Sequence, residues 1–89
     1  MNVSARIESK LALLEPESLA IHDDSARHAG HAGAKDGGGH YSVVIVSRRF
    51  SGVSIQLRHR MVYDALGSMM QQEIHALAIK AYAPEEIHR

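Results

Sequence analysis

Seven histidines in a chain of 89 residues are the side chains best suited to chemistry in this sequence. The segment SARHAGHAGAKDGGGHY surrounds three of them, His28, His31 and His40, with Gly, Ala and small polar residues. Imidazole is a common metal ligand, and a chain without cysteine has no thiolate of its own to offer. The sequence therefore indicates metal binding through imidazole, competing with the plainer interpretation of a solvated, flexible loop with incidental histidines.

His75 is the fourth candidate ligand, and it lies near the start of the segment EIHALAIKAY. If that segment is a strand, His75 shares a face with Leu77 and Ile79. The residues alone then favour a histidine half-buried at the edge of the core and hydrogen-bonded to backbone.

A second group of side chains is basic and lies in the later half of the chain. Its members are Arg48, Arg49, Arg58, His59, Arg60 and Lys80. We expect a modest basic patch near the start of a helix, where it could contact phosphate or a base edge. Ten Lys and Arg balance ten Asp and Glu, so the formal net charge is zero. That balance favours a solvated face or a docking surface for an acidic partner over nucleic-acid binding.

The totals also exclude several classes of protein. A chain of 89 residues has room for one small core, so we expect a single domain over residues 1–89. No serine stands in a recognisable nucleophile motif, no phosphate-binding loop occurs and the carboxylates show no pairing pattern, so we expect no enzyme. The start MNVSARIESK lacks a long apolar run, and no segment has the roughly 20 apolar residues of a membrane span. We expect a cytoplasmic protein with no membrane contact.

The hydrophobic periodicity predicts the elements that position these groups. Ser4 is the expected cap of a first helix with Ile7, Leu11 and Leu14 on one face, and Pro16 ends it. SLAIHDD alternates like a strand that points His22 away from the core, and HYSVVIVS is typical of a central strand, pairing antiparallel with the first.

The second half predicts a helix, a strand and a final helix. The helix begins near Ser54, and its apolar stripe is Ile55, Val62, Ala65, Leu66 and Met69. EIHALAIKAY fits a helix or a strand; we expect a third strand, because two strands alone are marginal in water. APEEIHR opens the last helix with Pro84 at its first position. The order α-β-β-α-β-α predicts an α+β domain with a three-stranded sheet covered by helices.

Three segments together resemble the BolA family over nearly the whole chain: DDSARHAGHAG, FSGVSIQLRHRMVYDAL and IHALAIKAY. The resemblance implies a fold like the class II K-homology (KH) domain, although the GXXG nucleic-acid clamp usual in that fold is absent from the expected region. It also implies a heterodimer with a monothiol glutaredoxin in iron–sulfur trafficking or iron and redox sensing. The cofactor would be a two-iron, two-sulfur (2Fe–2S) cluster shared with the glutaredoxin and its glutathione, and not held stably by this chain alone.

The resemblance also implies which histidines bind the cluster. His75 matches a family ligand near the start of the last strand. A second ligand comes from the loop between the first two strands, where His28, after Arg27, is the best match. The loop carries an extra HAG unit and a GGG run, so His31 and His40 remain as alternatives.

A rival hypothesis comes from another functional class. BolA-like proteins are also described as transcriptional regulators, and the helix with Arg58, His59 and Arg60, supported by Arg49 and Lys80, would then bind DNA. This hypothesis predicts binding to duplex DNA that weakens steeply with salt and is indifferent to His75.

Overall fold

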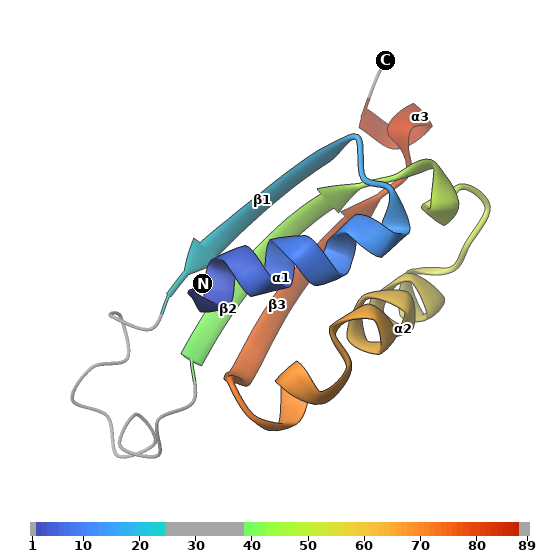
Figure 1. The fold of residues 1–89 in the computed structure, drawn as a ribbon. Coiled ribbons are helices and arrows are strands. Elements are labelled where there is room, and N and C mark those ends of the chain that lie inside the picture. Colours follow the sequence, from blue (N-terminus) through green and yellow to red (C-terminus); the bar gives the residue numbers. More distant parts are fainter. Residues whose placement is uncertain (1, 25–38, 88–89) are drawn as a thin grey trace.

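The computed structural model describes residues 2–24 and 39–87, which form one layer of helices on a three-stranded sheet (Figure 1). The elements, with η for 3-10 helices, are α1 (Val3–Leu11), η1 (Ala12–Leu14), β1 (Ser18–Asp23), β2 (Gly39–Val46), η4 (Arg48–Phe50), α2 (Ile55–Leu66), η5 (Gly67–Gln71), β3 (Ile74–Tyr82) and α3 (Pro84–Ile87). The predicted α+β class and the order α-β-β-α-β-α are confirmed.

The sheet has the order β1-β2-β3, with β2 in the centre. β1 pairs antiparallel with β2, as predicted, and its register aligns Ile21 with Val43. β3 pairs parallel with β2 and aligns Ile79 with Val43. EIHALAIKAY is therefore a strand, and α2 is the crossover that a parallel β2–β3 connection requires.

The two faces of the sheet differ in cover. On β2, Tyr41, Val43 and Ile45 are buried, whereas Ser42 and Val44 between them point to the opposite face and are only partly buried. Figure 1 shows α1 and α2 on one side of the sheet. The prediction that helices cover the sheet therefore holds for one face, and we call the other the open face.

The helices are held by the apolar stripes that the sequence predicts. Ile7 and Leu11 of α1 are fully buried, and so are Val62 and Leu66 of α2. Burying one such side chain contributes about 1.5–3 kcal/mol, which is more than a short helix gains from its own propensity. Phe50 of η4 is also fully buried, so it fixes the turn between β2 and α2.

The predicted cap of the first helix is wrong, and so is the place of Ile55 on the buried stripe of the second. Asn2, and not Ser4, caps α1: its Oδ1 accepts from the Ala5 N–H at 2.7 Å, so the helix begins one residue before Ser4. α2 begins next to Ser54 as expected, and Ser54 caps it, with its Oγ accepting from the Leu57 N–H at 3.2 Å. Ile55 lies at the first position of α2 and is 56% exposed. The first buried side chain of α2 is Arg58, so the helix packs on the core only from that residue onward.

The part of the chain that the structure describes contains no helix long and apolar enough to span a membrane.

Candidate functional site

An irregularity at the start of β2 and β3 positions His75. The register aligns Gly39 with Ile74 but His40 with Ala76, so β3 has one extra residue at this point, which is His75. Ile74 is buried and Leu77 packs against the core, whereas His75 is exposed. A bulge of this kind re-aims the extra side chain.

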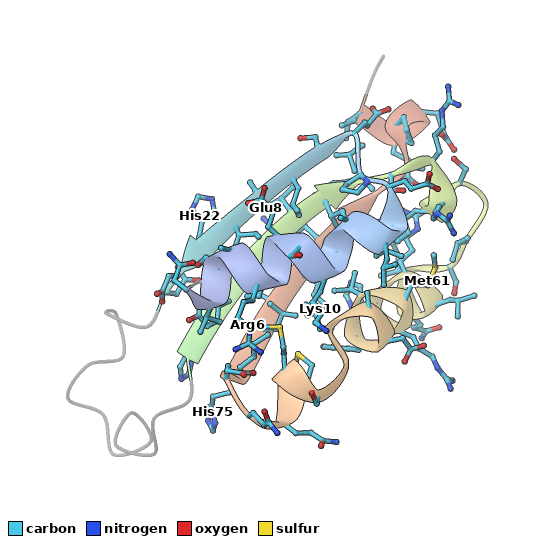
Figure 2. The ribbon with its side chains drawn as sticks, in the orientation of Figure 1. Arg6, Glu8, Lys10, His22, Met61 and His75 are labelled. Carbon is cyan, nitrogen blue, oxygen red and sulfur yellow. The ribbon has the colours of Figure 1, made fainter. Side chains whose placement is uncertain are left out.

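The prediction that His75 shares the core face with Leu77 is therefore wrong. A strict alternation over residues 75, 77 and 79 would put them on one face, but the bulge shifts the pattern by one residue. Figure 2 shows the His75 side chain at the start of β3, directed away from the α-helices.

The bulge brings His75 beside His40 of β2. The two ring centroids are 5.2 Å apart, and the ring planes are inclined by 48°. The rings come from neighbouring strands that are 35 positions apart in the sequence, so their proximity depends on the parallel pairing of β2 with β3. Of the four predicted ligands, His40 and His75 are brought together; His28 and His31 lie outside the described residues.

Backbone hydrogen bonds fix both sides of this histidine pair. The Gly39 N–H donates to the Glu73 carbonyl at 3.0 Å, which joins the residue before His40 to the start of β3. The Asp24 N–H donates to the His40 carbonyl at 2.7 Å, which joins β2 to the end of β1. His40 is thus held between both neighbouring strands.

Gly39 is required because the Tyr41 ring lies over it. A Cβ atom at position 39 would be 2.3 Å from Cε2 of Tyr41, closer than any real contact. Tyr41 is buried, and this burial, followed by the charge of Asp23, raises the pKa of its phenol. The phenol therefore stays neutral to a higher pH than an ordinary tyrosine, and its ring packs as part of the core.

An ion pair holds the chain just before His75 against α1. The Arg6 guanidinium donates to Oε1 of Glu73 at 2.7 Å, and the Glu73 side chain is only 23% exposed. Its Oε2 is buried and has no hydrogen-bond partner in the described ranges 2–24 and 39–87. The sequence analysis missed Glu73, and no spacing signal links it to Arg6.

A small hollow of about 260 Å³ opens beside His40, and Asp24, Ser42, Ala76 and Ala78 help to line it. The Ser42 hydroxyl donates to Oδ2 of Asp24. The sequence analysis missed Asp24 as well, although its place at the end of an alternating strand could have put it on the same edge as His40. Within residues 2–24 and 39–87, no group of three or more His, Asp or Glu side chains is arranged to hold a metal ion.

The basic residues predicted to form one patch do not lie together on one surface. Arg58 is 4% exposed, and its guanidinium donates to both carboxylate oxygens of Glu86, at 2.6 and 2.8 Å, and to the carbonyls of Val53 and Ala81. The prediction that Arg58 lies at a surface able to contact DNA is wrong. Arg58 is an internal clamp that joins α2 to β3 and α3.

The other basic residues are spread over the molecule. Arg49 donates to Oε1 of Glu15 at 2.6 Å, and Arg60 lies 4.0 Å from Asp64 on the same helix. His59 is half-buried, and Lys80, which aligns with Val44, projects from the open face. Because α2 covers the other face, Lys80 does not extend a patch around Arg60.

Comparison with known proteins shows the family of the chain. The family profile described as BolA-like protein matches residues 11–86. The chain belongs to the BolA family. A BolA relative from Arabidopsis thaliana, named Protein BOLA1, chloroplastic, is 43% identical over 96% of this chain and 56% of its own length. The chain therefore spans about half the length of that relative.

Two further comparisons place the fold within the BolA family. The DNA-binding transcriptional regulator BolA of Escherichia coli K12 is 40% identical over 97% of this chain and 80% of its own length. The solved structure of BolA1 from Arabidopsis thaliana superposes with a TM-score of 0.82 at 41% identity, covering 97% of this chain and 96% of that one. The α+β fold is that of BolA structures.

Proposed function

We propose that this BolA-family chain is a non-enzymatic accessory protein that pairs with a monothiol glutaredoxin and shares a 2Fe–2S cluster with it. The observation that carries the proposal is the His40–His75 pair, with ring centroids 5.2 Å apart at an edge of the sheet. The site serves iron–sulfur trafficking or the sensing of iron and redox state, and the protein acts in the cytoplasm.

The two imidazoles fit one iron of a cluster that is shared between two proteins. Two imidazoles on one tetrahedral metal have ring centroids about 5 Å apart when the metal–nitrogen bonds are about 2.0–2.1 Å, close to the separation of His40 and His75. Two imidazoles would supply the protein ligands of one iron. The thiolates for the other iron, which this cysteine-free chain lacks, would come from the glutaredoxin cysteine and from glutathione.

The residues around the pair have distinct roles in this proposal. When bound, the cluster supplies one-electron chemistry, and ligation by imidazole in place of thiolate raises its reduction potential. His75 and His40 would each hold iron through one ring nitrogen. Glu73 and Asp24 hold the strand ends from which the two imidazoles project.

The choice of the second ligand separates two versions of the proposal. His28 is the family-based candidate, and His31 lies near it in the sequence. His40 is favoured by its position beside His75. His28 or His40 together with His75 gives the same set of two imidazoles. Substitution of each histidine therefore has to decide between them.

The test is a titration of cluster-loaded monothiol glutaredoxin with this protein, followed by visible circular dichroism. We expect a spectral change that saturates near one to one. We expect it to disappear with His75→Ala and, if His40 is the second ligand, with His40→Ala but not with His28→Ala.

His22→Ala is the matched control, because His22 is an exposed histidine on the neighbouring strand β1. It should leave the titration unchanged. An unchanged glutaredoxin spectrum on addition of the wild-type chain would contradict shared ligation.

A second candidate function, DNA binding in transcriptional regulation, is favoured by one observation. The Escherichia coli relative, 40% identical, is named a DNA-binding transcriptional regulator. The exposed residue best placed to carry it is Arg60 on α2, with Lys80 as a comparison on the open face. Binding to duplex DNA that is lost with Arg60→Glu and kept with Lys80→Glu would support this second function. If Arg60→Glu left the binding unchanged, the proposed DNA-binding site would be wrong.

A further inference from the structure

The hollow beside His40 is a feature of the open face of the sheet. It has a volume of about 260 Å³, and its polar lining includes Asp24, His40 and Ser42. Its apolar lining includes Ala76 and Ala78, both on β3 and both exposed. No helix of the described ranges covers this side of the sheet in Figure 1.

The sequence of β3 creates the hollow. The register aligns Ala76 with His40 and Ala78 with Ser42, so two consecutive outward positions on β3 carry only a methyl group. The next outward position is Lys80, which aligns with Val44. The part of the hollow formed by β3, its floor, is therefore small and apolar. The histidine pair bounds this floor at one end, and the Lys80 side chain bounds it at the other.

A fixed carboxylate stands at the rim of the hollow. The Asp24 side chain accepts from the Ser42 hydroxyl, and the Asp24 N–H donates to the His40 carbonyl at 2.7 Å. These two bonds orient the carboxylate, and one hydroxyl contact leaves capacity for further donors. The carboxylate next to the floor of the hollow is thus a negative charge.

This combination matches one class of side chain. The stems of Arg and Lys lie favourably on apolar surface while their charged heads reach a polar group. A carboxylate accepts from an Arg or Lys head in a charge-assisted hydrogen bond, which is stronger than a neutral one. An anionic side chain would be repelled by Asp24, and a large apolar one would leave the carboxylate desolvated without a partner.

We propose that this hollow receives an Arg or Lys side chain of the partner protein, so that the partner docks on the open face of the sheet over β2 and β3. This inference rests on the proposed function, because it takes the partner to be the glutaredoxin that completes the cluster. It specifies the docking face and the charge of the partner residue beside the cluster.

The test compares two arginine substitutions on the same face. Ala78→Arg fills the hollow and places a like charge beside the expected cation, whereas Ala20→Arg adds the same side chain to β1, outside the hollow lining. Both alanines are exposed, so neither change enters the core. Amide NMR spectra of each variant confirm that the fold is kept.

The measurement is the dissociation constant for cluster-loaded monothiol glutaredoxin, by calorimetry at two salt concentrations. We expect Ala78→Arg to weaken binding at least tenfold and Ala20→Arg to change it less than twofold. We expect Asp24→Asn to weaken binding about three- to tenfold and to make the affinity less dependent on salt, because a charge pair is lost.

The outcomes separate this inference from the proposed function. If the wild-type chain binds and His75→Ala abolishes the spectral change, but Ala78→Arg binds like wild type, the docking face is wrong and the shared cluster stands. Tighter binding by Ala78→Arg would mean that part of this chain fills the hollow in the free protein, and would also overturn the inference. If the wild-type chain does not bind the glutaredoxin, both fail.

Discussion

At the scale of single residues, the position of His75 depends on small features of its neighbours. The bulge makes room for His75 as an extra residue opposite Gly39 and His40, and Gly39 has no side chain to meet the Tyr41 ring. The histidine pair is therefore built by residues that have no metal chemistry of their own.

Gly39→Ala should destabilise the fold and disturb the histidine pair. Its Cβ would lie 2.3 Å from the Tyr41 ring, so the ring or the strand must move. We expect a loss of about 1–3 kcal/mol in the free energy of unfolding, the usual cost of overpacking. Urea denaturation measures this loss.

A second substitution tests the cause. Tyr41→Leu removes the ring that the new Cβ would meet, so Gly39→Ala should cost clearly less in the Tyr41→Leu background. If Gly39→Ala lowered the free energy of unfolding equally in both backgrounds, the need for glycine at position 39 would not come from the Tyr41 ring.

Sequence reasoning at this scale identified His75 and His40 as candidates but could not bring them together. Alternation along EIHALAIKAY put His75 on the core face, because a bulge is a property of two paired strands and leaves no periodic signal in one of them. The burial of Arg58 was missed for a similar reason. Its partner Glu86 is 28 positions away, and only the packing of α3 joins them.

At the scale of elements, the clamp between Arg58 and Glu86 fixes the end of the chain. Arg58 of α2 binds both oxygens of Glu86 in α3, and Glu86 Oε1 also accepts from the Ala83 N–H at 2.8 Å. Arg58 further donates to the Ala81 carbonyl of β3 at 3.0 Å. Three elements therefore depend on one buried guanidinium.

Arg58→Met should be strongly destabilising. It keeps most of the apolar stem but removes every hydrogen bond of the guanidinium, leaving the Ala81 carbonyl without its donor. We expect a loss of roughly 2–4 kcal/mol in the free energy of unfolding, measured by urea denaturation. The control is Arg60→Met on the same helix, where the side chain is 77% exposed and the loss should be small. Similar losses in both variants would contradict the clamp.

The clamp also predicts a pH dependence. The hydrogen bond from Arg58, followed by that from the Ala83 N–H, lowers the pKa of Glu86 from its ordinary 4.5 to about 2. Because the pKa is lower in the folded state, the stabilisation is complete above pH 4.5 and is lost as the pH falls toward 2.

Glu86→Gln tests this dependence. Wild type should be more stable than the variant near pH 6, and the difference should shrink between pH 4.5 and about 2 when urea unfolding is followed at each pH. A difference that stayed constant over that range would mean that Glu86 does not titrate as the clamp requires.

At the scale of the whole molecule, the sequence predicted the architecture well and the distribution of charge poorly. The order of elements follows from hydrophobic periodicity, and the apolar stripe of Ile7, Leu11 and Leu14 is buried as expected. Which face of the sheet remains open, and which cations share a surface, are decided by tertiary packing. Arg60 follows Arg58 and His59 in the sequence, but it lies on the opposite side of the sheet layer from Lys80.

This distribution predicts weak, weakly salt-dependent DNA binding. Of the six residues expected to form the basic patch, Arg58 is buried and Arg49 is paired with Glu15. A slope of log K against log salt of about −1 to −2 corresponds to one or two phosphate contacts. Fluorescence anisotropy with a labelled duplex at several salt concentrations measures the slope, and a value of −5 or steeper would show an extended interface that this arrangement does not provide.

The most direct test of the central claim is to detect histidine nitrogen at the cluster. The protein is labelled with nitrogen-15 histidine, mixed with cluster-loaded monothiol glutaredoxin, reduced, and studied by pulsed electron paramagnetic resonance. The account predicts hyperfine couplings from two imidazole nitrogens in the wild-type complex, which disappear in His75→Ala and in His40→Ala and are unchanged in His22→Ala. A reduced cluster without imidazole coupling in the wild-type complex would contradict the account.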